Sequence, residues 1–327
     1  MRAMVVTEYG GPEVLKLQDR PTPEPGDKDL LVEVHSAGLN PVDYKIRLAP
    51  RWGDRTFPFV LGYDFSGVVR GVGKAVTGFQ EGDEIYASPS IIRDGSNAEF
   101  VCLDYRLAAP KPRTLDHTHA AALPLAVLTA WESLHLHGHI QPGDTVLIHA
   151  GAGGVGHLAV QLAKIHGCTV ITTSGSPESL EFCKHGGADH VLNYKEEDVF
   201  ERVKEITGGK LCPMVFDTVG GETFNISLRC VGYYGRAVTI VPGIPTEHIN
   251  SLFAKCASVH LEYMGLPGMF DVQPERQGQI LRKVGELVDA GKLKPHVSHR
   301  FKLEELRDAH RQQETGRTIG KIVLNVK

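Results

Sequence analysis

The stretch from Thr145 to Lys164 constrains the fold of this chain more than any other. Four mostly apolar residues, 145–148, lead toward Gly151, Gly153 and Gly156, which fit the pattern G-x-G-x-x-G. Apolar residues then recur at helical spacing, at Val155, Leu158, Ala159, Leu162 and Ala163. A strand, these glycines and a helix in succession are typical of a dinucleotide-binding loop, whereas the glycines alone would indicate only a tight turn.

Each glycine of this loop has its own physical reason. Gly151 allows the sharp turn, Gly153 lets the backbone approach a pyrophosphate, and Gly156 lets the helix pack closely on the strand. The first N–H groups of the helix then face the phosphates with the positive end of the helix dipole. We therefore expect a dinucleotide at the start of this helix, with Gly151, Gly153, Gly154 and Val155 as its ligands.

Length and charge limit the other functions. The 327 residues suit two domains, and a net charge of -4 without a Lys/Arg stripe argues against nucleic acid as a partner. The most apolar run, 120–131, is too short to span a membrane, and Pro124 interrupts it. The N-terminus lacks the apolar core of a signal peptide, and none of the six cysteines is paired as C-x-x-C. We expect a cytoplasmic protein with reduced cysteines and no membrane partner.

The first third of the chain has the pattern of a β-domain. Short apolar runs alternate with turns rich in Gly, Pro and Asp, which favours a barrel or a sandwich. The expected strands are 3–7, 30–35, 67–69, 84–87, 98–101 and 107–108.

From Thr145 onward, expected strands alternate with expected helices, which predicts a doubly wound parallel sheet. The strands are 145–150, 169–173, 190–194, 214–219, 236–241 and 259–264; the helices follow Gly154, Pro177, Glu196 and Glu222 and lie near Ile249. The last strand would be an edge, and we expect it to pair with its copy in a homodimer.

The tail predicts helices over 279–290 and 303–313 and a strand over 321–326. These elements are too few to form a domain and are expected to return to the first one. We therefore predict a catalytic domain of residues 1–123 and 265–327 and a dinucleotide domain of residues 124–264. The overall class is α/β.

The end of the second strand of the dinucleotide domain indicates which cofactor binds. A strand that serves NAD(H) normally ends in Asp or Glu, which binds the ribose 2′-hydroxyl. Here Ser174, Gly175 and Ser176 follow Thr173, and a serine hydroxyl can donate to a 2′-phosphate. This favours NADP(H). No Arg or Lys follows the strand directly and Glu178 is near, so NAD(H) stays open.

Several stretches, taken together, resemble one family. They are 37–47 (AGLNPVDYKIR), 61–69 (LGYDFSGVV), 128–131 (LTAW), 152–156 (AGGVG), 217–221 (DTVGG) and 320–324 (GKIVL). The chain is similar over nearly its whole length to the zinc-independent quinone oxidoreductase branch of the medium-chain dehydrogenase/reductase superfamily. The resemblance implies a GroES-like β-barrel domain beside a Rossmann domain.

The resemblance also bears on metal. Zinc-dependent relatives have a Cys at the position of Asn40 and a His at that of Tyr63, and Asn and Tyr are poor zinc ligands. The structural zinc lobe needs four cysteines, where this chain has Cys102 alone. His135 and His139 could meet on a helix face, for which a surface pair is the simpler interpretation. We expect no metal.

The implied reaction is hydride transfer from NADPH to a quinone or to the β-carbon of an α,β-unsaturated ketone. Asn40, Tyr44 and Tyr63 would then be catalytic, by donating to the carbonyl oxygen or by orienting the substrate or ribose. Tyr44 and Tyr63 could equally line an apolar wall. Asp43 and Arg47, at i and i+4, predict a structural ion pair.

The resemblance assigns further residues to cofactor and substrate. Asn40 and Thr129 would contact the nicotinamide end, Val241 the amide, and Ser174 and Tyr194 the 2′-phosphate. Ser179 stands where relatives often have a phosphate-binding Lys, and Arg317 could reach the cofactor from the tail. The substrate would meet a wall that includes Trp52, Phe57, Phe59 and residues 264–270.

Two alternatives remain at this point. One is a zinc-type alcohol dehydrogenase. The other is an NADPH-binding protein with a structural or regulatory role and no catalysis.

Overall fold

A computed structural model describes residues 1–51, 55–243 and 248–327. The chain divides into two compact units, which we call the discontinuous unit (Met1–Leu128 and Gly265–Lys327) and the continuous unit (Thr129–Met264). The sequence analysis places the boundary at 123/124, where helix α3 (Pro124–Trp131) begins, whereas the two units meet at 128/129, within that helix. In the described ranges, no helix has the length and apolar character to cross a bilayer.

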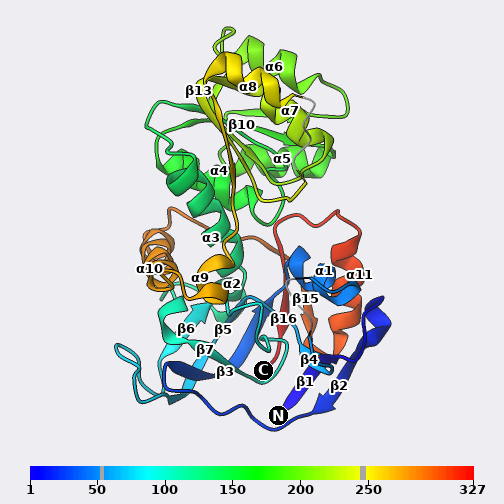
Figure 1. Cartoon of the computed structure of the whole chain (residues 1–327), viewed down its shortest axis with the longest axis vertical. Helices are drawn as coiled ribbons and strands as arrows, with labels where there is room; N and C mark the ends of the chain where they lie inside the picture. The colour runs from blue at the N-terminus through cyan, green and yellow to red at the C-terminus, as the bar shows by residue number, and fades with distance from the viewer. Residues whose placement is uncertain (52–54, 244–247) are drawn as a thin grey trace. The chain divides into compact units, whose positions relative to one another are not determined.

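The discontinuous unit is built on two sheets (Figure 1). The smaller has the order β2-β1-β4, formed by Leu15–Asp19, Arg2–Val6 and Phe59–Val60. The larger has the order β15-β16-β3-β5-β6-β8, formed by Val297–Lys302, Lys321–Asn325, Asp29–Gly38, Phe65–Val72, Glu84–Ala87 and Ala108–Pro110. Strand β7 (Phe100–Asp104) also pairs with β3.

Strand β3 organises the larger sheet because it pairs with β5, β7 and β16. Its Leu30, Val32 and Val34 alternate into the main apolar core, as expected for a half-buried strand. Strand β16 joins β3 antiparallel, with Leu324 opposite Ala37. The end of the tail thus lies in the same sheet as β3.

Five α-helices accompany these sheets in the described part of the discontinuous unit, besides the shared α3. They are α1 (Pro41–Leu48), α2 (His117–Ala121), α9 (Leu266–Phe270), α10 (Glu275–Asp289) and α11 (Leu306–Glu314). Two sequence expectations were wrong in detail. Residues 98–101 begin a strand only at Phe100, and Leu107 ends a 3-10 turn before β8. Strands β2 and β15 and helix α9 were not expected.

The continuous unit has one six-stranded parallel sheet of order β11-β10-β9-β12-β13-β14. The strands are His190–Asn193, Thr169–Ser174, Thr145–Ile148, Cys212–Asp217, Val231–Thr239 and Ser258–Leu261. Helices α4 (Gly156–Ile165), α5 (Pro177–His185), α6 (Val199–Ile206), α7 (Glu222–Cys230) and α8 (Ile249–Lys255) lie between them. The predicted doubly wound sheet is confirmed.

The strand order places the switch point of the sheet between β9 and β12, since the chain runs outward from β9 in one direction and then restarts at β12. Ligands of such sheets bind outside the carboxyl ends of the strands at that point. The glycine stretch 151–156 follows β9 and therefore lies at the switch point.

Candidate functional site

The glycine loop has no room for side chains at two of its three glycines. A Cβ on Gly151 would lie 2.1 Å from Thr172 Oγ1, and a Cβ on Gly156 would lie 2.1 Å from the carbonyl oxygen of Ala150. A Cβ on Gly153 would meet only that same oxygen, at 3.2 Å, so its other sides are open. The close packing expected of the first and third glycines is therefore present, together with an open backbone between them.

The loop also presents backbone donors. Gly153 donates to the carbonyl of Ala150 at 2.9 Å, which closes the turn. The N–H groups of Gly154 and Val155 find no acceptor among the described residues, and helix α4 begins directly after them. Free N–H groups at a helix start suit a pyrophosphate, so the residues present fit a dinucleotide.

A buried polar cluster that the sequence analysis missed lies at the same edge of the sheet. His149, 1 % exposed, directly follows β9, and its Nδ1 lies 3.2 Å from Thr173 Oγ1. Burial lowers the pKa of His149 to about 4, so the imidazole is neutral at physiological pH. The carboxylate of buried Asp217 accepts from Gly220 N–H at 2.9 Å and Thr239 Oγ1 at 2.8 Å. The first contact links the residue after β9 to β10, and the other two link the end of β12 to its own turn and to β13.

The tip of β10 differs from the expectation in one respect. Ser174 is buried and its hydroxyl donates to Ser179 Oγ at 2.5 Å. Ser179 in turn donates to the carbonyl of Ser176 at 2.9 Å and accepts from the Ser176 N–H at 3.1 Å. A hydroxyl has one proton to donate. The proton of Ser174 is thus used within the turn, although it was expected to serve a 2′-phosphate.

Tyr194 lies beside the same tip. A Cβ on Gly175 would come within 2.6 to 2.7 Å of the Tyr194 ring, so the ring rests against the bare backbone of that glycine. The side chain is 56 % exposed. Val241 follows β13 and contacts the Gly220 turn, where a Cβ would lie 2.5 Å from Val241 Cγ1. Thr129 is buried on α3, at the first position of the continuous unit.

In the discontinuous unit, Asn40 belongs to a buried polar network. Its Nδ2 donates to Asp64 Oδ2 at 2.7 Å, and its Oδ1 accepts from Lys321 Nζ at 2.6 Å. Lys321 Nζ also lies 2.8 Å from Asp64 Oδ2, and the other Asp64 oxygen accepts from Leu125 N–H at 2.6 Å. Burial raises the pKa of Asp64, and the Lys321 ammonium opposes that shift. The Asn40 amide is therefore fixed in one orientation.

Asp43 does not pair with Arg47, contrary to the sequence prediction. Its carboxyl accepts from Asn40 N–H at 2.6 Å and Gly62 N–H at 3.2 Å, and burial raises its pKa to about 7. Arg47 is fully buried at the other end of α1. It donates to Glu314 Oε1 at 2.7 Å and contacts His310 Nδ1 at 2.9 Å, because α11 packs there and offers nearer partners.

The two candidate tyrosines have different environments. Tyr63 is fully buried, its hydroxyl lies 3.5 Å from the carbonyl of Ile91, and burial raises its pKa. Tyr44, on α1, is half-buried, and burial also raises its pKa. Of the expected wall residues, Phe57 packs on Tyr9 and Phe59, whereas Trp52 lies outside the described residues.

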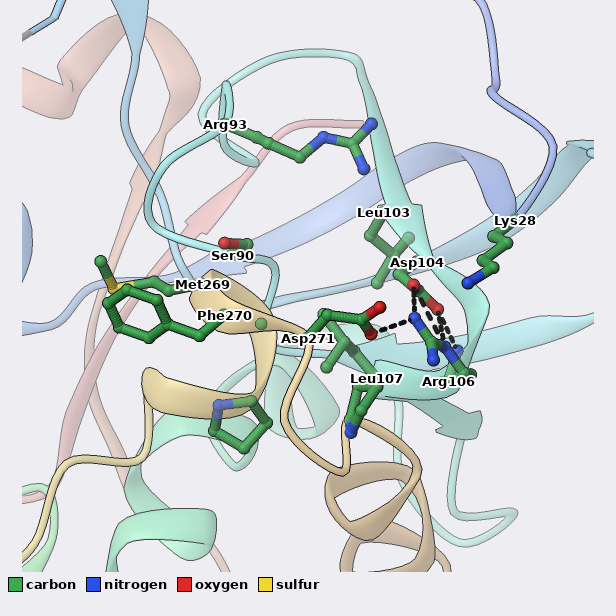
Figure 2. A pocket seen from close by; sticks show the side chains of 13 residues that line it. Lys28, Ser90, Arg93, Leu103, Asp104, Arg106, Leu107, Met269, Phe270 and Asp271 are labelled. Carbon is green, nitrogen blue, oxygen red and sulfur yellow. Dashed lines mark hydrogen bonds and ion pairs between the residues drawn. The ribbon is translucent and has the colours of Figure 1, made fainter.

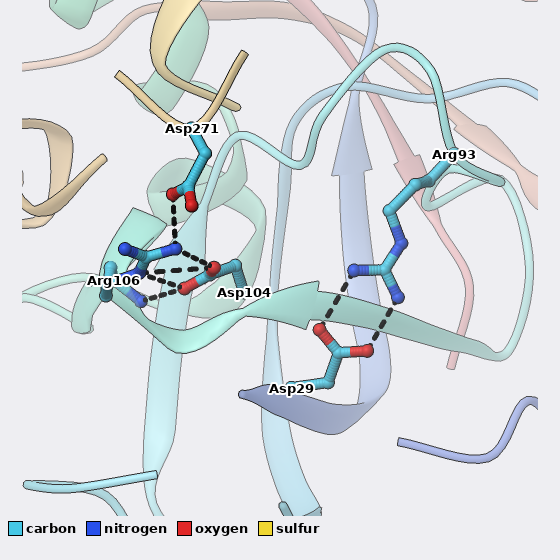
Figure 3. Close-up of polar contacts among 5 residues, drawn as sticks. All are labelled: Asp29, Arg93, Asp104, Arg106 and Asp271. Carbon is cyan, nitrogen blue, oxygen red and sulfur yellow. Dashed lines mark hydrogen bonds and ion pairs between the residues drawn. The ribbon is translucent and has the colours of Figure 1, made fainter. Parts of the chain in front are cut away.

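A cavity of about 450 Å³ lies within the discontinuous unit (Figure 2). The expected wall residues Met269 and Phe270 line it, beside Leu103 and Leu107. Four of its charged side chains belong to two ion-paired sets (Figure 3): Arg93 pairs with Asp29 at 2.7 Å, and Arg106 pairs with Asp104 at 2.6 Å and with Asp271 at 2.5 Å. Lys28 also lines the cavity. The cavity thus combines an apolar wall with guanidinium groups whose charges are already balanced.

His135 and His139 do not share a helix face. The π-helical turn ends at His137, and His139 has a left-handed backbone with φ of 47°. His135 instead packs against Trp131 and His166. In the described ranges, no group of three or more His, Cys, Asp or Glu side chains has the arrangement of a metal site.

Comparison with known proteins agrees with this architecture. Residues 26–113 match the alcohol dehydrogenase GroES-like domain, and residues 186–324 match the family described as zinc-binding dehydrogenase. The quinone oxidoreductase of Pseudomonas aeruginosa is 34% identical over 97% of this chain and 97% of its own length. The chloroplastic NADPH-dependent alkenal/one oxidoreductase of Arabidopsis thaliana is 32% identical over 99% of this chain and 79% of its own.

A solved structure gives the same result. The quinone oxidoreductase of Escherichia coli, complexed with NADPH, superposes with a TM-score of 0.90 at 29% identity and covers 100% of both chains. The fold and the glycine loop define a nucleotide-binding oxidoreductase of the medium-chain dehydrogenase/reductase class. Within that class, the chain belongs to the quinone oxidoreductase branch.

Proposed function

We propose that this protein reduces quinones or α,β-unsaturated carbonyl compounds with NADPH. The observation that carries the proposal is the glycine loop, with its free N–H groups and its tight Gly151 and Gly156, next to a β10 tip that bears no carboxylate. The P. aeruginosa and A. thaliana relatives named for these activities support the same substrates and cofactor. In this proposal, the continuous unit holds the cofactor and the discontinuous unit handles the substrate.

NADPH supplies a hydride when it is bound. Negative charge then develops on the carbonyl oxygen of the substrate, and a positioned donor stabilises that charge. Tyr44 is our candidate for this donor because its side chain is only half-buried and a tyrosine hydroxyl holds its proton at neutral pH, with a pKa that burial here raises further. Tyr63 is buried and has the carbonyl of Ile91 in reach of its hydroxyl, so it serves better as a wall that supports α1.

In this proposal, Asn40 orients the ribose or the substrate and does not transfer a proton. Its amide is held on both sides by Asp64 and Lys321, and it stands at the N-cap of the helix that carries Tyr44. An amide in a fixed orientation can present its remaining N–H to a ribose or a carbonyl without loss of conformational entropy on binding.

The proposed reaction needs no zinc. The two partners of the Asn40 side chain suit an amide: the Asp64 carboxylate accepts from its N–H, and the Lys321 ammonium donates to its oxygen. The competing function is a zinc-type alcohol dehydrogenase, which the description of one matching family favours. Metal analysis of the purified protein decides between them, because about one tightly bound zinc per chain contradicts our proposal.

We also propose that the protein is a cytoplasmic homodimer. Strand β14 is the edge of the parallel sheet, and its Leu261 is 58 % exposed. Edge strands with free backbone groups pair readily with a second copy. The six free cysteines support a reducing compartment. Sedimentation of the parent and of Leu261→Lys tests the dimer, which the lysine would weaken.

The function is tested by following the oxidation of NADPH, through its nicotinamide absorbance, with a panel of quinones, enones and saturated ketones. We expect turnover with quinones or enones and none with saturated ketones. Tight NADPH binding without turnover on any of them would favour a structural or regulatory role.

A further inference from the structure

The turn after β10 leaves a 2′-phosphate without the cation that it needs. The donated proton of Ser174 goes to Ser179, and Ser179 uses its own on the carbonyl of Ser176. Ser176 is exposed to solvent, but its hydroxyl lies 2.7 Å from Ser179 Oγ and is also engaged within the turn. A phosphate monoester carries about two negative charges at neutral pH, which hydroxyl groups alone compensate poorly.

One basic residue is available at the carboxyl ends of strands β10 and β11. The turns that follow β10 and β11, residues 174–180 and 193–198, contain Lys195 and no other Lys or Arg. Strands β10 and β11 are parallel, with Ser174 opposite Asn193, so both turns lie at the same carboxyl end. Tyr194 N–H donates to the carbonyl of Ser174 at 3.2 Å, which carries the pairing one residue further.

The chain then turns at Lys195. Its N–H donates to Asn193 Oδ1 at 3.2 Å, and the N–H groups of Glu196 and Glu197 both donate to the carbonyl of Asn193. Lys195 thus follows directly after the tyrosine whose ring rests on Gly175. Its side chain is exposed, and it forms no ion pair with any described residue.

Of the neighbouring carboxylates in these two turns, the exposed Glu178 and Glu196 form no ion pair with a described residue, whereas Glu197 and Asp198 are already engaged. Glu197 pairs with Arg202 at 3.0 Å and accepts from Asn193 N–H at 2.8 Å. Asp198 accepts from Glu201 N–H at the start of α6. Lys184, farther along α5, lies 3.6 Å from Glu181. At the carboxyl ends of β10 and β11, Lys195 is therefore the cation that can pair with a ligand.

We propose that Lys195 is the residue that selects NADPH over NADH, by pairing with the ribose 2′-phosphate beside the Tyr194 hydroxyl. This inference rests on the proposed function and adds the residue that decides between the two nicotinamide cofactors. Gly175 is part of the same proposed phosphate site, because any larger residue there would displace the Tyr194 ring.

The test is equilibrium binding of NADPH and of NADH, followed by nicotinamide fluorescence, with the parent, Lys195→Ala and Lys195→Arg. We expect Lys195→Ala to weaken NADPH about tenfold and to leave NADH unchanged, as for loss of one exposed charge-assisted hydrogen bond. Lys195→Arg should retain the preference. Lys184→Ala is the matched control and should alter neither affinity. Added salt should weaken NADPH binding to the parent more than to Lys195→Ala.

Each outcome is decisive. Equal weakening of both cofactors by Lys195→Ala would show a structural role and overturn the inference, as would an unchanged preference for NADPH. Adenosine 2′,5′-bisphosphate, which lacks the nicotinamide, should compete with NADPH on the parent and about tenfold less well on Lys195→Ala. If the parent binds neither dinucleotide, the proposed function itself fails; if it binds NADPH and Lys195→Ala is unaffected, only the inference fails.

Discussion

Lys321 Nζ and Asp64 Oδ2 form a buried ion pair of 2.8 Å, although 257 positions separate the two residues in the chain. Both side chains are almost inaccessible to solvent. Asn40 bridges them through its amide, so the strand that ends the tail, the segment before β5 and the start of α1 meet at one point. The position of α1, and with it Tyr44, depends on this point.

Removal of one partner of this ion pair should therefore lower the stability of the protein. We expect Lys321→Met to lower the free energy of unfolding by about 3 to 5 kcal/mol, because it leaves Asp64 buried without its counter-charge. The double variant Asp64→Asn with Lys321→Met removes both charges and should recover a large part of that loss. Urea titrations of the parent and the variants measure this. A single variant as stable as the parent would show that the pair is unimportant.

Substitution of Tyr44 and substitution of Tyr63 should have different effects on kcat. We expect Tyr44→Phe to lower kcat at least about tenfold, as for loss of a donor to the developing charge. Tyr63→Phe should change kcat less than about twofold, since its hydroxyl is buried beside a backbone carbonyl. The measurement is steady-state turnover of the best substrate from the panel. The reverse order would assign the donor to Tyr63.

The free energy of unfolding should depend on pH through the titration of Asp43. Its pKa is about 7 in the folded protein and near 4 when unfolded, so between those values the folded state holds a proton that the unfolded state has lost. The contribution of Asp43 is thus fully present below about pH 4 and is lost as the pH rises to about 7, by at most about 1.4 kcal/mol per unit.

The check is the difference in the free energy of unfolding between the parent and Asp43→Asn, measured from pH 4 to 8. Buried His149 and His310, whose lowered pKa values give the opposite slope, are common to both proteins and cancel in the difference. Asp64 and Lys321 also remain in both. We expect the advantage of the parent to decline with rising pH and to level off above about pH 7. A flat difference would contradict the raised pKa.

The glycine loop allows a matched pair of substitutions. Gly156→Ala puts a Cβ against the rigid carbonyl of Ala150 and should cost about 1 to 3 kcal/mol and weaken NADPH binding. Gly186→Ala is the control, because Gly186 has φ of -70° and its nearest contact would be 3.3 Å. Thermal melting and NADPH titration report both effects. Equal behaviour of the two variants would argue against the tight packing of the loop.

The sequence predicts the continuous unit better than the discontinuous one. Its strands and helices alternate with clear periodicity, and the loop at 151–156 carries its own signature, so β9 and α4 follow from local pattern. Strand β15 has no such pattern: its exposure alternates between partial and full, and its partner β16 lies beyond a helix. Pairing over long sequence separations leaves little local signal.

The candidate site shows the same division. Gly151, Gly153 and Gly156 were found from spacing alone. The partners of Asp43 and Arg47 were assigned wrongly, because helical spacing favoured a local pair while the tertiary structure supplied Gly62 and Glu314. Nothing in the sequence links positions 64 and 321. The commitment of the Ser174 proton to Ser179 is likewise a matter of geometry.

The division of the discontinuous unit into two chain segments sets an order of events during synthesis. The continuous unit is complete once residue 264 has been made, and it can form its parallel sheet while the rest of the tail is still being translated. The larger sheet of the other unit cannot close until β16 reaches β3 and Lys321 reaches Asp64. During synthesis, the fold of the continuous unit can therefore form before the fold that carries Tyr44.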